Sequence, residues 1–522
     1  MSNADYDVII VGSGAGGGTL ALQLAKAGKR TLLLERGDYL KRERDNWDSK
    51  AVFVDGKYQA DETWFDHRGH AFHPGLHYVV GGNTKVYGSA LFRLRERDFG
   101  EVVHSDGVSP AWPLPYDVFE PYYMRAEQLF HVHGQRGEDP CEPPSSGPYA
   151  YPPVAHEPRM QQLCEALERD GHRPFHQPLG VLLDEVGTRA LPHSACVRCD
   201  AFDGFPCLTN GKADAQIICV DPARAYDNFT LMTGAYVERL ETDPAGRTVT
   251  GVHVRHTNGE QAMYHGDIVV SACGALSSAL LMFRSAGDKH PNGLANGSDQ
   301  VGRNYMRHNN AAFLAVSRAP NDTVFQKTVA ITDYYFGADD WEFPLGCIQT
   351  NGKSHGEQVE GEALPGFMQW FPSMPFDQIA RHAMDFWVMS EDLPLPTNRI
   401  TLARDGRVML DVSPTGGEAH RRLSRKLEQL LTKVDAHPQL LTRSLYLGKN
   451  IPIGGTAHQA GTMRFGTDPA GSVLDLDCRA HELDNLYCVD AGFFPSIGAV
   501  NPTLTIIANA LRVADHLIAR LS

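Results

Sequence analysis

The sequence has no long uncharged apolar stretch, and this absence argues against a membrane-spanning helix. Crossing a bilayer takes roughly 18 or more consecutive apolar residues. The nearest approach, residues 268–283, is interrupted by three serines and a glycine. That pattern is more typical of a buried strand that runs into a helix. We therefore expect no association with the membrane interior.

The chain also lacks an excess of basic residues and a dense set of cysteines. It contains 48 Lys and Arg against 63 Asp and Glu, a formal net charge of −15, which disfavours nucleic acid and anionic membranes as partners. Ten cysteines among 522 residues are too few for a disulfide framework. The first residues, MSNADYDVIIVG, show neither the basic nor the apolar region of a secretory signal. We expect a cytoplasmic protein with reduced thiols.

A strand, a glycine-rich turn and a helix are predicted at the amino terminus. The buried strand pattern DVIIV at residues 7–11 leads into the turn GSGAGG, which is followed by the helical pattern TLALQLAKAGK. Gly12 permits the tight turn, Gly14 lets a pyrophosphate approach the backbone, and Gly17 lets the helix pack on the strand. The free N–H groups at the start of the helix would bind the phosphates.

A second predicted strand supplies an acid at the spacing that this motif requires. Residues 31–35, TLLLE, end in Glu35, which lies 23 positions after Gly12. A carboxylate there accepts hydrogen bonds from the adenosine ribose of a dinucleotide. The combined pattern predicts dinucleotide binding and leaves the choice between FAD and NAD open.

Further elements follow along the chain. Residues 81–88, GGNTKVYG, form a second turn at which backbone can approach a ligand. From residue 229 the pattern alternates as in strands, with a hairpin turn expected at residues 257–259. Residues 421–434 predict an amphipathic helix, and residues 501–517 predict a long helix with Pro502 in its first turn. At 522 residues, two domains or one domain with an inserted lobe are expected.

A single histidine stands out among small residues near the carboxyl end. It is His458 in the segment GGTAHQAGTMRFG, residues 454–466. A lone histidine is usually a solvated or hydrogen-bonded structural residue. Its surroundings in the sequence do not decide between that role and catalysis.

These segments together resemble the glucose–methanol–choline (GMC) oxidoreductases, a family of FAD-dependent alcohol oxidases and dehydrogenases. The resemblance rests on GSGAGGG with Glu35, on GGNTKVYG, and on the block HQAGTMRFG…VDAGFFPSIGAVNPTLTIIANAL. It is thinner over residues 140–200 and 311–385. The segment WPLPYDVFEPYYMRAEQLF and the carboxyl block look most similar to the pyranose oxidase branch and its bacterial glycoside-oxidising relatives.

The resemblance implies an α/β fold with two parts. A Rossmann-type FAD-binding domain would comprise residues 1–100, 201–310 and 450–522. A substrate-binding lobe with an antiparallel β-sheet would comprise residues 101–200 and 311–449.

The resemblance also implies the catalytic residues. His458 matches the family's catalytic histidine, and Asn501 matches the asparagine that partners it in this branch. A neutral imidazole near pH 7 suits the removal of a hydroxyl proton, and an uncharged amide can bind the same hydroxyl without competing for its proton. The helix that starts at Pro502 would direct its positive end toward the flavin.

The residues that would contact FAD fall in the same motifs. Val237 lies where the family's backbone meets the adenine, and Asp490 matches a residue near the ribityl chain. Val86 stands where fungal pyranose oxidases have the histidine that binds FAD covalently, so we expect non-covalent FAD. The full implied set is Gly12, Gly14, Gly17, Glu35, Gly82, Asn83, Thr84, Val86, Val237, Asp490, Ala491, Asn501, Pro502 and Thr503.

The resemblance implies FAD-dependent oxidation of a secondary ring hydroxyl, C2 or C3, of a pyranose sugar or glycoside to a keto-sugar, with O2 reduced to H2O2. The alternative is a sugar or alcohol dehydrogenase that passes electrons to a quinone or cytochrome partner. A flavoprotein that only binds is a third class, but it would keep His458 and Asn501 without a use for them.

The cysteines bear on the choice between oxidase and dehydrogenase. Some dehydrogenases of the family carry an iron–sulfur cluster near the position of Cys196, Cys199 and Cys207. No fourth cysteine is close, since Cys219 lies 12 residues beyond Cys207. Plain thiols, a disulfide, zinc and a three-iron cluster stay open, and we assign no metal ligand.

Two further groups have open roles in the predicted substrate lobe. Glu391 and Asp392 would either bind sugar hydroxyls or form a solvated turn. Four aromatic residues would either stack on a sugar or fill the core, and we favour the core. They are Trp370, Phe371, Phe386 and Trp387.

Overall fold

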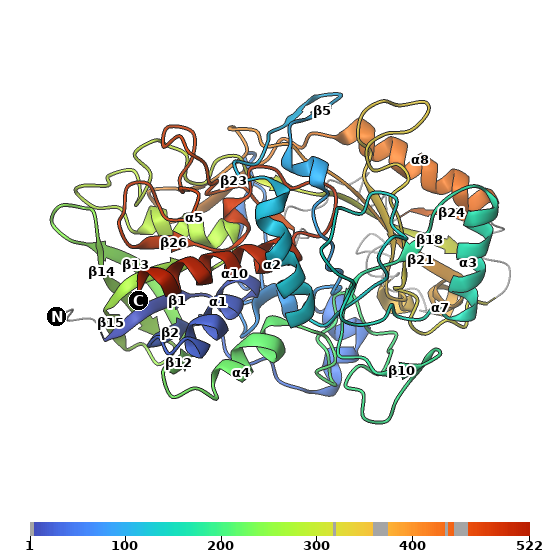
Figure 1. Ribbon diagram of the computed structural model, residues 1–522, viewed down its shortest axis with the longest axis horizontal. Helices are drawn as coiled ribbons and strands as arrows, with labels where there is room; N and C mark the ends of the chain where they lie inside the picture. The colour runs from blue at the N-terminus through green and yellow to red at the C-terminus, as the bar shows by residue number, and fades with distance from the viewer. Residues whose placement is uncertain (1–4, 317–319, 359–373, 434–436, 443–457) are drawn as a thin grey trace.

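The computed structural model describes residues 5–316, 320–358, 374–433, 437–442 and 458–522. Two sheets of different kind lie side by side (Figure 1). One is a parallel sheet next to the carboxyl-terminal helix, and the other is an antiparallel sheet flanked by helices at the opposite end of the molecule.

The parallel sheet has five strands, and its central strand is the predicted amino-terminal one. Val8, Ile9 and Ile10 are fully buried, as expected for a strand covered on both faces. In spatial order the strands are β12 (Phe229–Met232), β2 (Thr31–Leu34), β1 (Tyr6–Val11), β16 (Gly266–Ser271) and β26 (Leu486–Cys488).

Helices pack against this sheet and against one another. α1 (Ala15–Lys26) lies beside α10 (Thr503–Arg520), and α10 also contacts α2 (Tyr116–Leu129) (Figure 1). The predicted long helix is confirmed, but Pro502 occupies its N-cap position and the first helical residue is Thr503. The helix therefore starts two residues after Asn501, the predicted catalytic asparagine.

A three-stranded antiparallel sheet confirms the predicted hairpin. It consists of β13 (Ala235–Thr242), β14 (Val249–His256) and β15 (Gln261–Tyr264). The turn between β14 and β15 contains the predicted Thr257-Asn258-Gly259, and Gly259 has a φ of 86°. Glycine adopts this conformation without the steric cost that a side chain would bring.

The second large sheet is antiparallel and has six strands. In spatial order they are β24 (His437–Thr442), β18 (Asn309–Val316), β21 (Ala383–Ser390), β20 (Cys347–Thr350), β19 (Val329–Ile331) and β8 (Phe175–His176). α8 (Gly417–Lys433) covers it with Leu423, Leu427 and Leu430, and begins four residues before the predicted Arg421.

The architecture confirms the predicted fold class, because a Rossmann-type parallel sheet is joined to a lobe built on an antiparallel sheet. The division of the chain at residues 100, 200, 310 and 449 stays a prediction. Among the helices of the described residues, none combines enough length and apolar character to cross a bilayer.

Candidate active site

The turn after β1 admits no side chain at two of its glycines. Gly12 has a φ of 101°, and a Cβ atom on it would lie 2.4 Å from the carbonyl oxygen of Ala272. A Cβ on Gly17 would lie 1.9 Å from the carbonyl oxygen of Gly12. Both distances are far below van der Waals contact, so these glycines permit the tight turn and the close packing of α1 on the sheet.

Gly14 differs from them because the space beside it is open. A Cβ atom there would meet nothing within 4 Å, and no side chain caps α1 at this residue. A Cβ on Gly82, in the second glycine turn, would lie 3.3 Å from Cα of Gly14. The two turns therefore face each other beside uncapped N–H groups at the start of a helix, an arrangement that suits a pyrophosphate.

Glu35 joins the two glycine turns. Its carboxylate accepts hydrogen bonds from Ser13 N at 3.1 Å, Ser13 Oγ at 2.5 Å and Gly37 N at 2.9 Å. Gly81 N in turn donates to Ser13 Oγ at 3.0 Å. Burial raises the pKa of Glu35. The carboxylate thus lies at the end of β2, as the motif predicts, and also holds the glycine turns together.

The other residues of the second turn shape its backbone. Asn83 Oδ1 accepts from His77 N at 3.0 Å, and Thr84 Oγ1 donates to the carbonyl of Gly81 at 2.5 Å. Val86 is half-buried and ends the short 3-10 helix η3 (Gly82–Lys85). These side chains position the turn by binding neighbouring protein groups.

Asp490 links the ends of two more strands of the parallel sheet. It follows β26 and accepts hydrogen bonds from Gly492 N at 2.8 Å, Ser278 Oγ at 2.5 Å and Gly274 N at 3.1 Å. Gly274 lies in the turn after β16, and the carbonyl of Ala491 accepts from Gly461 N at 3.1 Å. Burial raises the pKa of Asp490.

The segments that follow β1, β16 and β26 thus meet at the carboxyl edge of the sheet, where open α/β folds bind their ligands. Uncapped N–H groups, open space at Gly14 and two buried carboxylates make a donor and acceptor set that fits FAD. Pro502 is the N-cap of α10 and Thr503 is its first residue, whereas Val237 is 5% exposed and belongs to β13.

Strand pairing places a second histidine opposite His458. His458 precedes β25 (Gln459–Ala460), which pairs with β17 (Met306–Arg307) in antiparallel register. Arg307 faces Gln459 in this register, so the next residue, His308, comes opposite His458. The two Nδ1 atoms are 2.8 Å apart, and the rings are nearly perpendicular, at 88°.

Both histidines lie in a site that disfavours their charged forms. Burial, assisted by Lys327, lowers the pKa of His458 to about 4. Burial and the neighbouring His458 lower the pKa of His308 well below its usual range. His458 is therefore a neutral imidazole at pH 7, the protonation state that a general base requires.

Asn501 is oriented by side chains of the antiparallel-sheet lobe. Gln349 of β20 donates from Nε2 to Asn501 Oδ1 at 2.8 Å. Gln177 donates to Gln349 Oε1 at 3.1 Å. Because its oxygen accepts a protein hydrogen bond, Asn501 retains its amide N–H groups as donors for a ligand.

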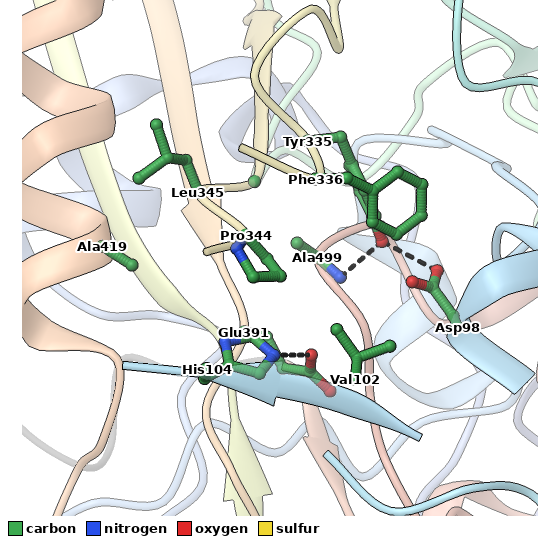
Figure 2. A pocket seen from close by; sticks show the side chains of 11 residues that line it. Asp98, Val102, His104, Tyr335, Phe336, Pro344, Leu345, Glu391, Ala419 and Ala499 are labelled. Carbon is green, nitrogen blue, oxygen red and sulfur yellow. Dashed lines mark hydrogen bonds and ion pairs between the residues drawn. The ribbon is translucent and has the colours of Figure 1, made fainter. Parts of the chain in front are cut away.

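A buried polar network holds the loop that leads to Asn501 (Figure 2). Gly498 N donates to Glu391 Oε1 at 3.0 Å, and Ala499 N donates to Tyr335 Oη at 2.8 Å. Tyr335 Oη donates to Asp98 Oδ2 at 2.8 Å. Burial, together with the charge of Glu391, raises the pKa of Asp98 to about 7.

Glu391 and Asp392 do not form a solvated turn. They are 8% and 0% exposed, and both bind protein groups. Glu391 also accepts from Ser109 Oγ at 2.8 Å and pairs with His104 at 3.1 Å (Figure 2), whereas Asp392 accepts from Thr415 N at 2.8 Å. Both carboxylates therefore support backbone segments around the site.

Cys196, Cys199 and Cys207 are free thiols, which removes the disulfide alternative. Within the described ranges no group of three or more His, Cys, Asp or Glu side chains is arranged to hold a metal ion. Of the four aromatic residues, Phe386 is 1% exposed and belongs to the core, and Trp387 is half-buried. Trp370 and Phe371 lie outside the described residues.

His308 and Gln349 were not among the residues predicted to lie at the site. Each lies about 150 positions from its partner, and neither belongs to a motif that predicts a role. The pairing of β17 with β25 and the position of β20 bring them to the site.

Comparison with protein families gives matches over much of the chain. The family described as GMC oxidoreductase matches residues 179–310 through its amino-terminal region and residues 396–510 through its carboxyl-terminal region. A FAD-binding domain matches residues 7–47, which contain the glycine turn and Glu35.

Several curated proteins are similar over nearly their whole length. The chain is 32% identical to 6'''-hydroxyparomomycin C oxidase of Streptomyces lividus, covering 98% of this chain and 92% of the relative. It is 31% identical to paromamine 6'-oxidase of Streptomyces fradiae, covering 99% and 92%. It is 26% identical to the fructose dehydrogenase large subunit of Gluconobacter japonicus, covering 99% of both.

Solved structures share the fold at lower sequence identity. Pyridoxine 4-oxidase from Mesorbium loti superimposes with a TM-score of 0.67 at 19% identity, covering 98% of this chain and 99% of the other. Formate oxidase from Aspergillus oryzae, as an R554A variant, gives a TM-score of 0.68 at 16% identity, covering 100% and 99%.

Proposed function

Because the chain belongs to the GMC oxidoreductases, FAD enzymes that act on CH–OH donors, we propose that it oxidises a secondary ring hydroxyl, C2 or C3, of a pyranose sugar or glycoside to a keto-sugar. The electrons pass to O2, which leaves as H2O2. The observation that carries this proposal is the half-buried His458, whose lowered pKa of about 4 keeps it neutral, together with Asn501, whose side chain is oriented by Gln349.

Each of these two residues has a distinct task in the proposed reaction. His458 takes the hydroxyl proton at Nε2, and Asn501 donates an N–H to the same oxygen and holds it in place. FAD, when bound by the glycine turns, Glu35 and Asp490, supplies the acceptor for the hydride that leaves the carbon. We propose that it is held without a covalent bond, because Val86 offers no nucleophilic ring nitrogen.

The names of the relatives support a carbohydrate substrate. One relative is named for fructose, and two are named for paromamine and for 6'''-hydroxyparomomycin C. The positions 6' and 6''' in those names favour a second candidate, in which the hydroxyl at position 6 of a sugar is oxidised. The two candidates share His458 and Asn501 and differ in the carbon presented to the cofactor.

The names of the relatives also differ in the kind of electron acceptor that they imply. Two are named oxidases, at 31% and 32% identity, and the third is named a dehydrogenase. We propose O2 as acceptor, with a quinone or cytochrome partner as the alternative, and a cytoplasmic location for the reaction.

An anaerobic substrate screen tests the proposal. Sugars and glycosides are mixed with the purified yellow protein, and loss of the flavin colour is followed before and after air is admitted. Matched sugars that lack the hydroxyl at C2, C3 or C6 identify the oxidised position. We expect bleaching that persists with the 6-deoxy sugar, and H2O2 once air is present.

Each contrary outcome of the screen has a defined meaning. Bleaching lost only with the 6-deoxy sugar would move the site of oxidation to position 6. Colour that returns with a quinone but not with air would replace the oxidase by a dehydrogenase. No bleaching by any sugar or glycoside would contradict the proposed function.

A further inference from the structure

We propose that His308 is a positioning residue that fixes which ring nitrogen of His458 carries the proton, so that Nε2 of His458 is the free base. The inference rests on the proposed function, in which His458 accepts the hydroxyl proton. It concerns the atom of His458 that is available for this step.

His308 forms a hydrogen bond with a backbone carbonyl. His308 Nε2 lies 2.9 Å from the carbonyl oxygen of Gly498. A carbonyl oxygen has no proton, so it accepts in this bond and His308 Nε2 donates. The proton of His308 is therefore on Nε2.

The rings of His308 and His458 are both neutral, and this fixes the position of the second proton. A neutral imidazole carries one N–H, so a proton on Nε2 leaves Nδ1 of His308 with a lone pair. Burial of both rings favours the neutral forms. Because the Nδ1 atoms of His308 and His458 are 2.8 Å apart, His458 Nδ1 donates to His308 Nδ1. The remaining nitrogen of His458, Nε2, is then unprotonated.

The carbonyl that accepts from His308 belongs to Gly498, whose backbone position is tightly constrained. Gly498 has a φ of 60°, and a Cβ atom on it would lie 2.9 Å from Leu94 and 3.1 Å from Asp98 Oδ2. The N–H groups of Gly498 and Ala499 bind Glu391 and Tyr335, which lie around one small cavity in Figure 2. The peptide that carries this carbonyl is held through Ala499 N, and the preceding peptide is held through Gly498 N, so both hydrogen bonds favour the orientation toward His308.

The loop that contains Gly498 also leads to Asn501, the predicted partner of His458. Asn501 lies three residues after Gly498, and Gln349 takes its oxygen as acceptor. His458 therefore offers a lone pair and Asn501 offers N–H groups. This is the arrangement that an alcohol hydroxyl needs, because the hydroxyl donates to the first and accepts from the second.

Two substitutions of nearly equal shape separate this role from simple packing. His308→Asn keeps an acceptor oxygen near the position of Nδ1, whereas His308→Leu has almost the same shape and no acceptor. We expect His308→Leu to bleach its flavin roughly 10–100-fold more slowly, by analogy with the loss of a group that orients a metal-bound histidine. His308→Asn should recover most of that loss.

The readouts besides rate are FAD content, thermal unfolding and the ring ¹⁵N shifts of His458 in ¹⁵N-histidine-labelled protein. The wild type should show His458 protonated at Nδ1, and His308→Leu should lose this preference. The wild-type shifts test the inference even if the leucine variant does not fold. Protonation at Nε2 in the wild type, or equal rates for the two variants, would overturn it.

A His458→Ala control distinguishes this failure from failure of the proposed function. If His458→Ala bleaches at the normal rate, the proposed catalytic role is wrong. If His458→Ala is slow and both His308 variants are normal, only the role of His308 is wrong.

Discussion

The residue to which we assign the proton transfer, His458, is a half-buried histidine whose ring disfavours the charged form. An exposed imidazole has a pKa near 6.5 and is partly charged at neutral pH. Burial and Lys327 lower the pKa of His458 to about 4, because desolvation penalises the imidazolium. The ring of His458 is then neutral throughout the physiological pH range, as the proposed proton transfer requires.

This pKa predicts the pH dependence of the reaction. Below its pKa His458 is protonated and has no lone pair at Nε2, so kcat/KM should fall as pH decreases through about 4. Above that value the ring is neutral, and kcat/KM should stay level between roughly pH 6 and 8. The measurement is kcat/KM for the best substrate of the screen, from pH 3.5 to 8.

The matched variant is His458→Ala. It should lower the rate by roughly 10²–10⁴-fold, the usual contribution of a positioned general base, and should lack the acid limb. FAD content should remain near that of the wild type. A limb near pH 6.5 in the wild type would show that the histidine is solvated in the working enzyme.

At the scale of elements, the glycines at the junction of β1 and α1 have different roles. A methyl group on Gly17 would collide with the backbone of Gly12, at 1.9 Å, whereas a methyl group on Gly14 would enter open space. Gly17 is therefore needed for packing inside the protein. Gly14 is needed for the approach of a ligand.

The two alanine substitutions should therefore differ in kind. Gly17→Ala should lower the free energy of unfolding of the apoprotein by about 1–3 kcal/mol, the usual cost of overpacking. Gly14→Ala should change it by less than about 1 kcal/mol but weaken FAD binding at least roughly tenfold, about 1.4 kcal/mol. Denaturant unfolding of apoprotein and FAD titration measure the two effects. Equal FAD affinity in Gly14→Ala and wild type would place the pyrophosphate elsewhere.

At the scale of the whole molecule, the site is assembled from segments that are remote in sequence. The ligand edge of the parallel sheet collects residues from both ends of the chain, and the antiparallel-sheet lobe adds Gln349 through β20. A cofactor bound there would contact many segments. Its retention would then depend on the folded state and not on a single covalent bond.

Unfolding should accordingly release the flavin. We expect acid or heat precipitation of the yellow protein to leave the colour in the supernatant, since Val86 offers no ring nitrogen for attachment. Absorbance of the supernatant at the flavin maximum measures the released fraction. Colour that stays with the washed pellet would show a covalent link through another residue.

The sequence by itself determined the features that depend on neighbours along the chain. The turn with Gly12, Gly14 and Gly17, the strand that ends in Glu35 and the helix after Pro502 could be predicted because turn sterics and burial patterns are local properties. The resemblance of the motifs singled out His458 and Asn501 in the same way, as residues within short recognisable segments.

Only the tertiary structure decided how those residues are oriented and protonated. His308 reaches His458 through the pairing of β17 with β25, Gln349 reaches Asn501 from another sheet, and Glu391 proved buried where a solvated turn had been an alternative. Hydrogen bonds and desolvation depend on distance in space, and contacts between residues about 150 positions apart leave no pattern in a single sequence. The sequence therefore indicates which groups could react, and the pairing of β17 with β25 and the Gly498 carbonyl determine the hydrogen bonds that we propose fix the protonation of His458.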